Sequence, residues 1–299
     1  MSDDDADILS DDDPLPVPPA SPHTRGVTHA FQSAAARDAS ASRAFEADHT
    51  AAIVLEYDGT RFCGWTRQPG LPSIEGELLA AFAVLSSEVL EWRCAGRTDA
   101  GVHASAQVVS LAWNGPISPE RIERVLNSYL PADIAIRRAV QCDPAFDARH
   151  DATARSYEFR ILVSPSHAPL RARFVLHHPR PLDRDLLHAC AAAIVGTHDF
   201  IAFTPTKTLH RFFHRTVLAA AWHERGDELV FSITGNAFLR NMVRILMGSM
   251  LAVGRGDMTL FHFQSLLAGA PRSQAYSTAL PTGLCLVDVG YPPALDPFA

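Results

Sequence analysis

The sequence lacks several features that would assign a protein class at once. No apolar run reaches the ~18 residues that a membrane-spanning helix needs, so we expect no membrane span. The N-terminus is acidic and has no basic-then-apolar pattern, so we expect no secretory signal. The five cysteines lie far apart and include no CxxC pair, which favours reduced thiols and a cytoplasmic protein.

Metal-ligand spacings and lysine are also scarce. The 14 histidines include no HExxH motif or other closely spaced set, so we predict no metal site. Lys207 is the only lysine among the 26 basic residues. Arginine suits bidentate contacts with phosphate, but a GC-rich genome would enrich it too, so this bias alone does not identify a nucleic-acid partner.

The negative charge is concentrated at one end. Of the net charge of −7, residues 1–48 carry the whole excess, with ten acids and three bases. Residues 49–299 hold 23 of each, and a neutral body can still contain a basic cleft. Residues 1–48 also combine an Asp cluster, the run PLPVPPASP and an Ala/Ser-rich stretch. We therefore predict a disordered acidic N-terminal extension.

Hydrophobic periodicity predicts the same order of elements twice, β-α-β-β-α-β, in units 49–154 and 155–299. The expected strands are 51–57, 89–95, 106–113, 132–140, 155–163, 216–224, 228–235 and 283–291, and the expected helices are 74–85, 121–130, 183–195, 239–253 and 260–268. This is the ferredoxin-like, split βαβ order. We expect an α+β protein in which two such units form one mostly antiparallel sheet, with helices on one face and a central active-site cleft.

The segment CAGRTDAGVHASAQ, residues 94–107, is the most informative stretch of the chain. Gly96 and Gly101 allow a sharp turn between two expected strands. Asp99 offers an oxygen nucleophile or base, and Arg97 offers donors for phosphate or carboxylate. For an arbitrary RTD in a loop, a tight turn with a surface ion pair is the commoner explanation.

The longer string GRTDAGVHA resembles the signature of the TruA-type tRNA pseudouridine synthases. Four further segments are similar to the family's other motifs and occur in its order: EYDGTRFCGW (56–65), FDARHDATARSYEF (146–159), NAFLRNMVRILMGSMLAVGRG (236–256) and GLCLVDVGYP (283–292). The resemblance covers roughly residues 50–292. Two positions depart from it, because Thr66 and Glu75 stand where the family commonly has glutamine, which affects details of RNA contact.

The resemblance implies a role for each of four residues. Asp99 matches the catalytic aspartate, and Arg244 matches the arginine that pairs with it. Arg97 matches the arginine that helps to displace the target base from its stack, and Tyr157 matches the tyrosine that contacts this base. We expect Arg240, one helical turn before Arg244, to face RNA phosphate.

The implied reaction is isomerisation of uridine to pseudouridine at positions 38, 39 and 40 in the anticodon arm of tRNA. It proceeds without a cofactor, in a cytoplasmic homodimer that holds the tRNA across both subunits. The carboxylate either attacks the sugar or base, or removes a proton from the sugar; the sequence leaves these open. Three alternatives also stay open: a related synthase with another RNA site, a non-catalytic tRNA-binding protein, and a carboxylate-dependent hydrolase, which would need a second positioned acid.

Overall fold

The computed structural model describes residues 46–208 and 210–299. The disorder predicted for the acidic extension therefore lies almost wholly outside the described residues. The first strand in the described part of the chain starts at His49, two residues before the expected start at 51. Just before it, the backbone N–H of Asp48 donates to Asn114 Oδ1 at 2.8 Å, so the chain is tied to the body from this point on.

The first half has the predicted order of elements. It comprises β1 (His49–Tyr57), α2 (Ile74–Val84), β2 (Glu88–Cys94), β3 (His103–Asn114), α3 (Ile122–Asn127) and β4 (Ile134–Gln141). The start of α2 shows why the sequence forms these elements. Ser73 accepts a hydrogen bond from the N–H of Gly76 as the N-cap, and Leu78 and Phe82, one turn apart, are buried.

The second half repeats this order with insertions. It comprises β5 (Ala154–Val163), β6 (Leu176–His178), α4 (Arg184–Ile194), β7 (Gly196–Asp199), β8 (His214–Arg225), β9 (Glu228–Gly235), α5 (Met242–Gly254), α6 (Leu260–Leu266) and β10 (Leu284–Gly290). Short 3-10 turns lie at Gly59–Arg61, Pro119–Arg121, Pro169–Arg171, Ile201–Phe203 and Arg272–Gln274. The expected helix 260–268 is thus present as α6. No helix in the described part of the chain is both long enough and apolar enough to cross a membrane.

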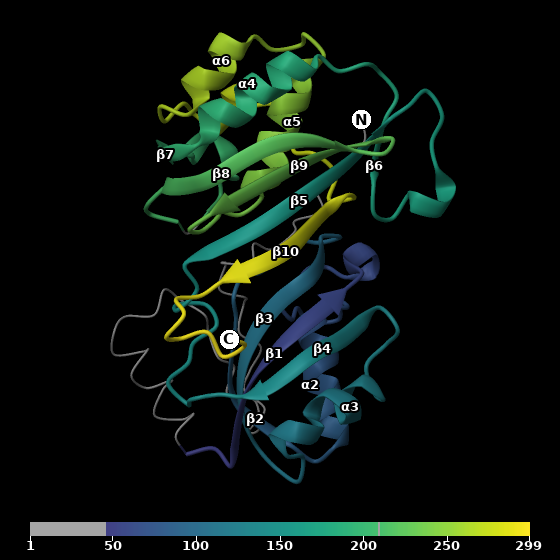
Figure 1. The fold of residues 1–299 in the computed structure, drawn as a ribbon, viewed down its shortest axis with the longest axis vertical. Helices are drawn as coiled ribbons and strands as arrows, with labels where there is room; N and C mark the ends of the chain where they lie inside the picture. The colour runs from purple at the N-terminus through teal and green to yellow at the C-terminus, as the bar shows by residue number, and fades with distance from the viewer. Residues whose placement is uncertain (1–45, 209) are drawn as a thin grey trace.

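The ten strands of residues 46–208 and 210–299 belong to one sheet, ordered β4-β1-β3-β10-β5-β9-β8-β7, with β2 also on β3 and β6 on β5. The two halves use the same internal order, since β4-β1-β3-β2 corresponds to β10-β5-β9-β8. The pairs β3–β10 and β5–β6 are parallel and the others are antiparallel. Figure 1 shows β10 lying between β3 and β5, where it joins the halves. The predicted α+β fold is confirmed.

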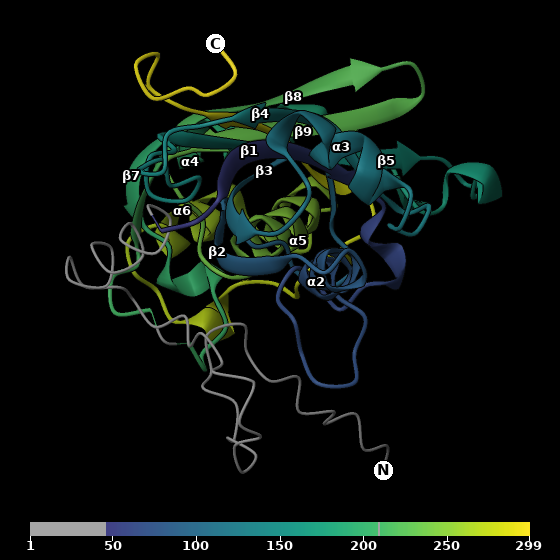
Figure 2. The same cartoon turned by 90° about the horizontal axis from the view of Figure 1, so that it is seen from below.

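The helices cover one face of the sheet, and the C-terminal segment lies against the other (Figure 2). The main core fills the helical side; Ile53 and Leu55 of β1 belong to it. Val54 points the opposite way and packs, together with Phe298, against a small cluster of Ala95, Val108 and Ala148. This alternation is that of a strand with both faces covered.

Two helix boundaries differ most from the sequence prediction. Helix α5 begins at Met242, not at 239, because Asn241 adopts a left-handed conformation with φ 57°. Residue 240 therefore lies in the turn before the helix, and the expectation that Arg240 sits one helical turn before Arg244 was wrong. Helix α3 is also shorter than the expected 121–130, since it ends at Asn127 and Pro119–Arg121 form a 3-10 turn before it. The division into domains at 154/155 stays a prediction, because one core contains residues from both halves.

Candidate active site

The loop between β2 and β3 carries Asp99, and the segment after β1 holds it in place. The N–H of Trp65 donates to the Thr98 carbonyl at 3.0 Å, and the N–H of Gly101 donates to the Phe62 carbonyl at 3.1 Å. Gly101 has φ +76°, a conformation that favours glycine. A side chain at Gly59 would collide with the backbone carbonyl of Val102. These contacts fix the backbone on both sides of Asp99.

Gln107 and Tyr57 brace the same loop from the sheet. The Gln107 amide donates to the carbonyl of Gly96 at 2.5 Å and accepts from its N–H at 3.3 Å. The hydroxyls of Tyr57 and Thr98 lie 2.8 Å apart. Sequence reasoning gave neither Gln107 nor Tyr57 a role. Because both are fully or almost fully buried, we infer that they orient the loop.

Asp99 and Arg244 come together as the resemblance implies. Arg244 Nη1 lies 3.6 Å from Asp99 Oδ2, and the two side chains are 17% and 21% exposed. The guanidinium is aimed by two further contacts, since Nε donates to the Ala279 carbonyl at 3.0 Å and Nη1 donates to Asn241 Oδ1 at 2.9 Å. Burial raises the pKa of Asp99, while the nearby Arg244 and Arg240 act in the opposite direction by favouring the carboxylate.

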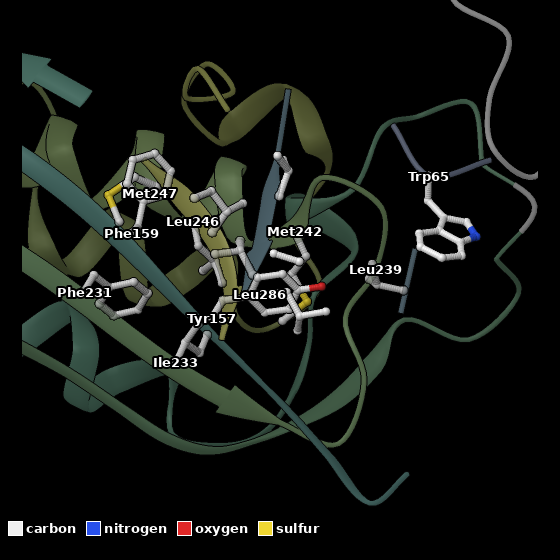
Figure 3. Close-up of a cluster of buried hydrophobic side chains, with 14 of the residues drawn as sticks. Trp65, Tyr157, Phe159, Phe231, Ile233, Leu239, Met242, Leu246, Met247 and Leu286 are labelled. Carbon is white, nitrogen blue, oxygen red and sulfur yellow. The ribbon is translucent and has the colours of Figure 1, made fainter. Parts of the chain in front are cut away.

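Tyr157 projects from β5 beside this pair. Its side chain is almost buried, at 8% exposure, and its ring meets Phe238 edge-on at 5.3 Å between centroids. Figure 3 shows Tyr157 close to Leu286 and Met242, where the core approaches the site. Burial, with a smaller contribution from Asp99, raises the pKa of the Tyr157 hydroxyl, so the group stays protonated at neutral pH.

All four residues predicted from the sequence line one pocket of about 460 Å³. This volume is in the range of small-molecule sites. Seven of the lining side chains are arginines: Arg93, Arg97, Arg149, Arg155, Arg215, Arg240 and Arg244. The acids that line the pocket are Glu75 and Asp99. The neutral body thus contains a basic pocket, as the charge distribution allowed, and its positive charge suits an anionic ligand.

Arg155 is a residue of this pocket that sequence reasoning missed. It is buried at 8% exposure and makes five hydrogen bonds to backbone carbonyls. They run to Ala95 from Nε at 3.0 Å and from Nη2 at 2.9 Å, to Ala152 and Asn236 from Nη1 at 2.9 Å each, and to Arg149 from Nη2 at 2.5 Å. These contacts join the Asp99 loop, the segment before β5 and the turn after β9. The feature of the sequence that could have indicated Arg155 is its position two residues before Tyr157, in the segment ARSY.

A second missed group lies at the rim. His150 Nδ1 lies 2.7 Å from Asp147 Oδ2, and Asp147 Oδ1 accepts from the N–H groups of Arg149 and His150 at 2.9 and 3.0 Å. Burial alone would raise the pKa of Asp147, but the hydrogen bonds from His150 and Arg149 outweigh it and hold the pKa at about 2. His150 and Arg149 both line the pocket.

We expect Asp147→Asn to destabilise the protein by on the order of 2 kcal/mol at neutral pH, because a pKa near 2 lies nearly two units below that of an unfolded aspartate. A lowered pKa contributes stability above the unfolded value, and this contribution is lost as the pH falls through the folded value. The difference from wild type should therefore shrink between about pH 4 and pH 2. Denaturant unfolding across this range measures it, with Asp288→Asn, on the exposed surface of β10, as the control. A pH-independent difference would contradict the assignment.

Glu75, which stands where the family commonly has glutamine, lines the pocket but is largely buried. It is only 8% exposed, and its carboxylate accepts a 2.6 Å hydrogen bond from the backbone N–H of Arg67. Burial raises its pKa. Glu75 thus packs within the segment that holds the Asp99 loop. Within residues 46–208 and 210–299, no three His, Cys, Asp or Glu side chains gather as metal ligands would, and the absence of a metal stays a prediction.

Comparison with known proteins identifies the family of this chain. The sequence model of the tRNA pseudouridine synthase family matches residues 53–151 and 190–292. The tRNA pseudouridine synthase A of Shewanella amazonensis is 39% identical over 241 residues, 81% of this chain and 92% of that protein; that of Idiomarina loihiensis is 38% identical with the same coverage. A Cbf5–Nop10–Gar1 complex is similar in structure at a TM-score of 0.34 and 13% identity, over 78% of this chain and 50% of that one, a likeness too low to assign anything. This chain belongs to the tRNA pseudouridine synthase family.

Proposed function

We propose that this protein isomerises uridine to pseudouridine in tRNA, at positions 38, 39 and 40 of the anticodon arm. The observation that carries the proposal is a single carboxylate, Asp99, held 3.6 Å from Arg244 in an arginine-lined pocket. The relatives with 38–39% identity are named tRNA pseudouridine synthase A. The chain covers 92% of their length, so the similarity that supports the proposal extends over nearly the whole of these proteins.

The reaction breaks the bond between uracil N1 and ribose C1′ and forms one between C5 and C1′. The proton on C5 leaves and a proton is gained at N1, so no electrons are gained or lost and no cofactor is required. Asp99 supplies the carboxylate that attacks the nucleoside or removes a sugar proton. Arg244 keeps this carboxylate ionised and aimed, in opposition to the burial that raises its pKa.

Two further residues act on the RNA. Tyr157 presents a nearly buried ring in the pocket, and such a ring stacks on a base that has been turned out of its helix. Arg97 lies two residues from Asp99 on the same loop and lines the same pocket. Its fork of donors is placed to contact the nucleotide backbone while the base is displaced. Both roles follow the family resemblance.

The cellular setting follows the same resemblance. We infer that the protein is cytoplasmic and acts as a homodimer that holds one tRNA across both subunits. The described residues contain no helix fit to span a membrane, and the cysteines among them are unpaired. A sedimentation experiment on the purified protein, alone and with tRNA, tests the dimer and its stoichiometry.

The proposed function is tested by chemical mapping of pseudouridine in tRNA from cells with and without the protein, and in unmodified tRNA treated with the purified protein. We expect pseudouridine at positions 38–40 where the tRNA has uridine there, and only when the protein is present. Pseudouridine at other sites would instead identify a related synthase. Binding of tRNA with no modification would identify a non-catalytic binding protein.

A further inference from the structure

Phe212 is an aromatic side chain with no place in the core. It lies in the segment between the 3-10 turn Ile201–Phe203 and β8, and it is 76% exposed. The next residue, Phe213, turns inward and packs against the main core. A single exposed apolar side chain is ordinary on a protein surface, so its meaning depends on how firmly it is held and on what surrounds it.

The backbone around Phe212 is fixed from two sides. Arg215 Nη1 donates to the Phe212 carbonyl at 2.9 Å and to the His214 carbonyl at 2.8 Å. The N–H of Phe200 donates to the Phe213 carbonyl at 3.1 Å. Arg215 itself lines the pocket that contains Asp99. The backbone that carries Phe212 is therefore held by an arginine whose own side chain lines the pocket.

The surroundings of Phe212 are basic. Lys207 and Arg211 are exposed in the same segment, and so is His214 at the start of β8. His210 lines the pocket. From Phe200 to His223 the sequence contains no acidic residue. This charge suits a polyanion next to the pocket, whereas an apolar protein partner would need further apolar side chains around the ring.

We propose that Phe212 stacks on an unpaired RNA base next to the uridine that enters the pocket, and that Arg211 and His214 contact the phosphates on either side. An aromatic ring among basic side chains is the usual platform for single-stranded RNA. This inference rests on the proposed function, since it requires RNA at the pocket. It adds a second aromatic contact, outside the pocket, to that of Tyr157 within it.

The test compares Phe212→Leu, which keeps an apolar side chain without a ring, with Phe212→Trp, which restores one. Base–aromatic stacking is worth roughly 1–3 kcal/mol. We therefore expect the Leu variant to bind unmodified tRNA at least about 5-fold more weakly, and the Trp variant to bind like wild type. Phe261→Leu is the matched control, because Phe261 on α6 is 81% exposed and is given no RNA contact. Its affinity should not change.

A second readout detects the stack directly. An anticodon stem-loop with 2-aminopurine beside the target uridine should lose fluorescence on binding wild type, and lose much less on binding Phe212→Leu. Equal affinity and equal quenching for the two proteins would overturn the inference. A change of oligomeric state in Phe212→Leu would also overturn it, because Phe212 would then lie in a protein interface. Pseudouridine formation by wild type, scored separately, shows whether the proposed function itself holds.

Discussion

Asp99→Asn is expected to abolish pseudouridine formation while leaving tRNA affinity nearly unchanged. The amide keeps the shape of the side chain but is neither a nucleophile nor a base, and positioned acid–base groups alone contribute about 10²–10⁴-fold. We expect a loss of at least this size. Single-turnover assays with unmodified tRNA, together with a direct binding measurement, separate the two effects. Turnover at a tenth of the wild-type rate would remove Asp99 from the reaction.

The same substitution should not destabilise the fold. Burial raises the pKa of Asp99, so the ionised carboxylate is less favourable in the folded protein than in the unfolded chain. A raised carboxyl pKa costs stability at every pH above the folded value, and the neutral amide removes this cost. Thermal unfolding at neutral pH should show the Asp99→Asn variant to be at least as stable as wild type. A large drop in melting temperature would mean that lost activity reports misfolding.

Much of the fold was predictable because local patterns determine it. The apolar run of β1, the alternation along β5 and the apolar turns of α2 and α4 each follow from the residues of one segment. For the contact between the two halves, the sequence predicted that they share one sheet but not which strands pair. This contact depends on two parallel partners, Cys285 with His103 and Leu286 with Ala104, which are far apart in sequence, and no local pattern specifies such a register.

Some residues of the site were likewise predictable from the sequence and others were not. The four residues predicted from the motifs meet in one pocket, and each of them was taken from a motif that resembles one of the family's. Arg155 and Gln107 were missed, since their partners are backbone carbonyls and N–H groups that any residue would supply. Asn241 was missed for a related reason: its left-handed backbone places the start of the helix inside residues 239–253, a segment whose apolar residues fit a single helix. Such conformations are determined by tertiary contacts and not by periodicity.

Arg244→Ala is expected to impair catalysis far more than tRNA affinity. Arg244 contacts Asp99, Asn241 and the Ala279 carbonyl, which are all groups of the protein. Its loss therefore leaves the Asp99 carboxylate without the positive charge and the contact that orient it. Misplacement of a catalytic group by ~1 Å costs about 10²-fold in rate, and we expect a fall of that order in single-turnover rate. Arg240→Ala is the contrasting variant, because Arg240 lines the pocket from the turn before α5 and favours the Asp99 carboxylate less strongly than Arg244 does. It should weaken tRNA binding more than catalysis.

The pH dependence of the rate tests whether Arg244 acts on Asp99. Burial raises the pKa of Asp99 and Arg244 opposes that rise, so removing the guanidinium should raise the pKa further. If the ionised carboxylate is the active form, the rate falls as the pH drops through this pKa, and the acidic limb of the profile in Arg244→Ala should move to higher pH. Arg244→Lys keeps a positive charge but cannot bond Ala279 and Asn241 with the same fork. The Arg244→Lys variant should therefore keep the acidic limb near its wild-type pH, although its rate stays low. An acidic limb that does not move in either variant would show that Arg244 does not control the ionisation of Asp99.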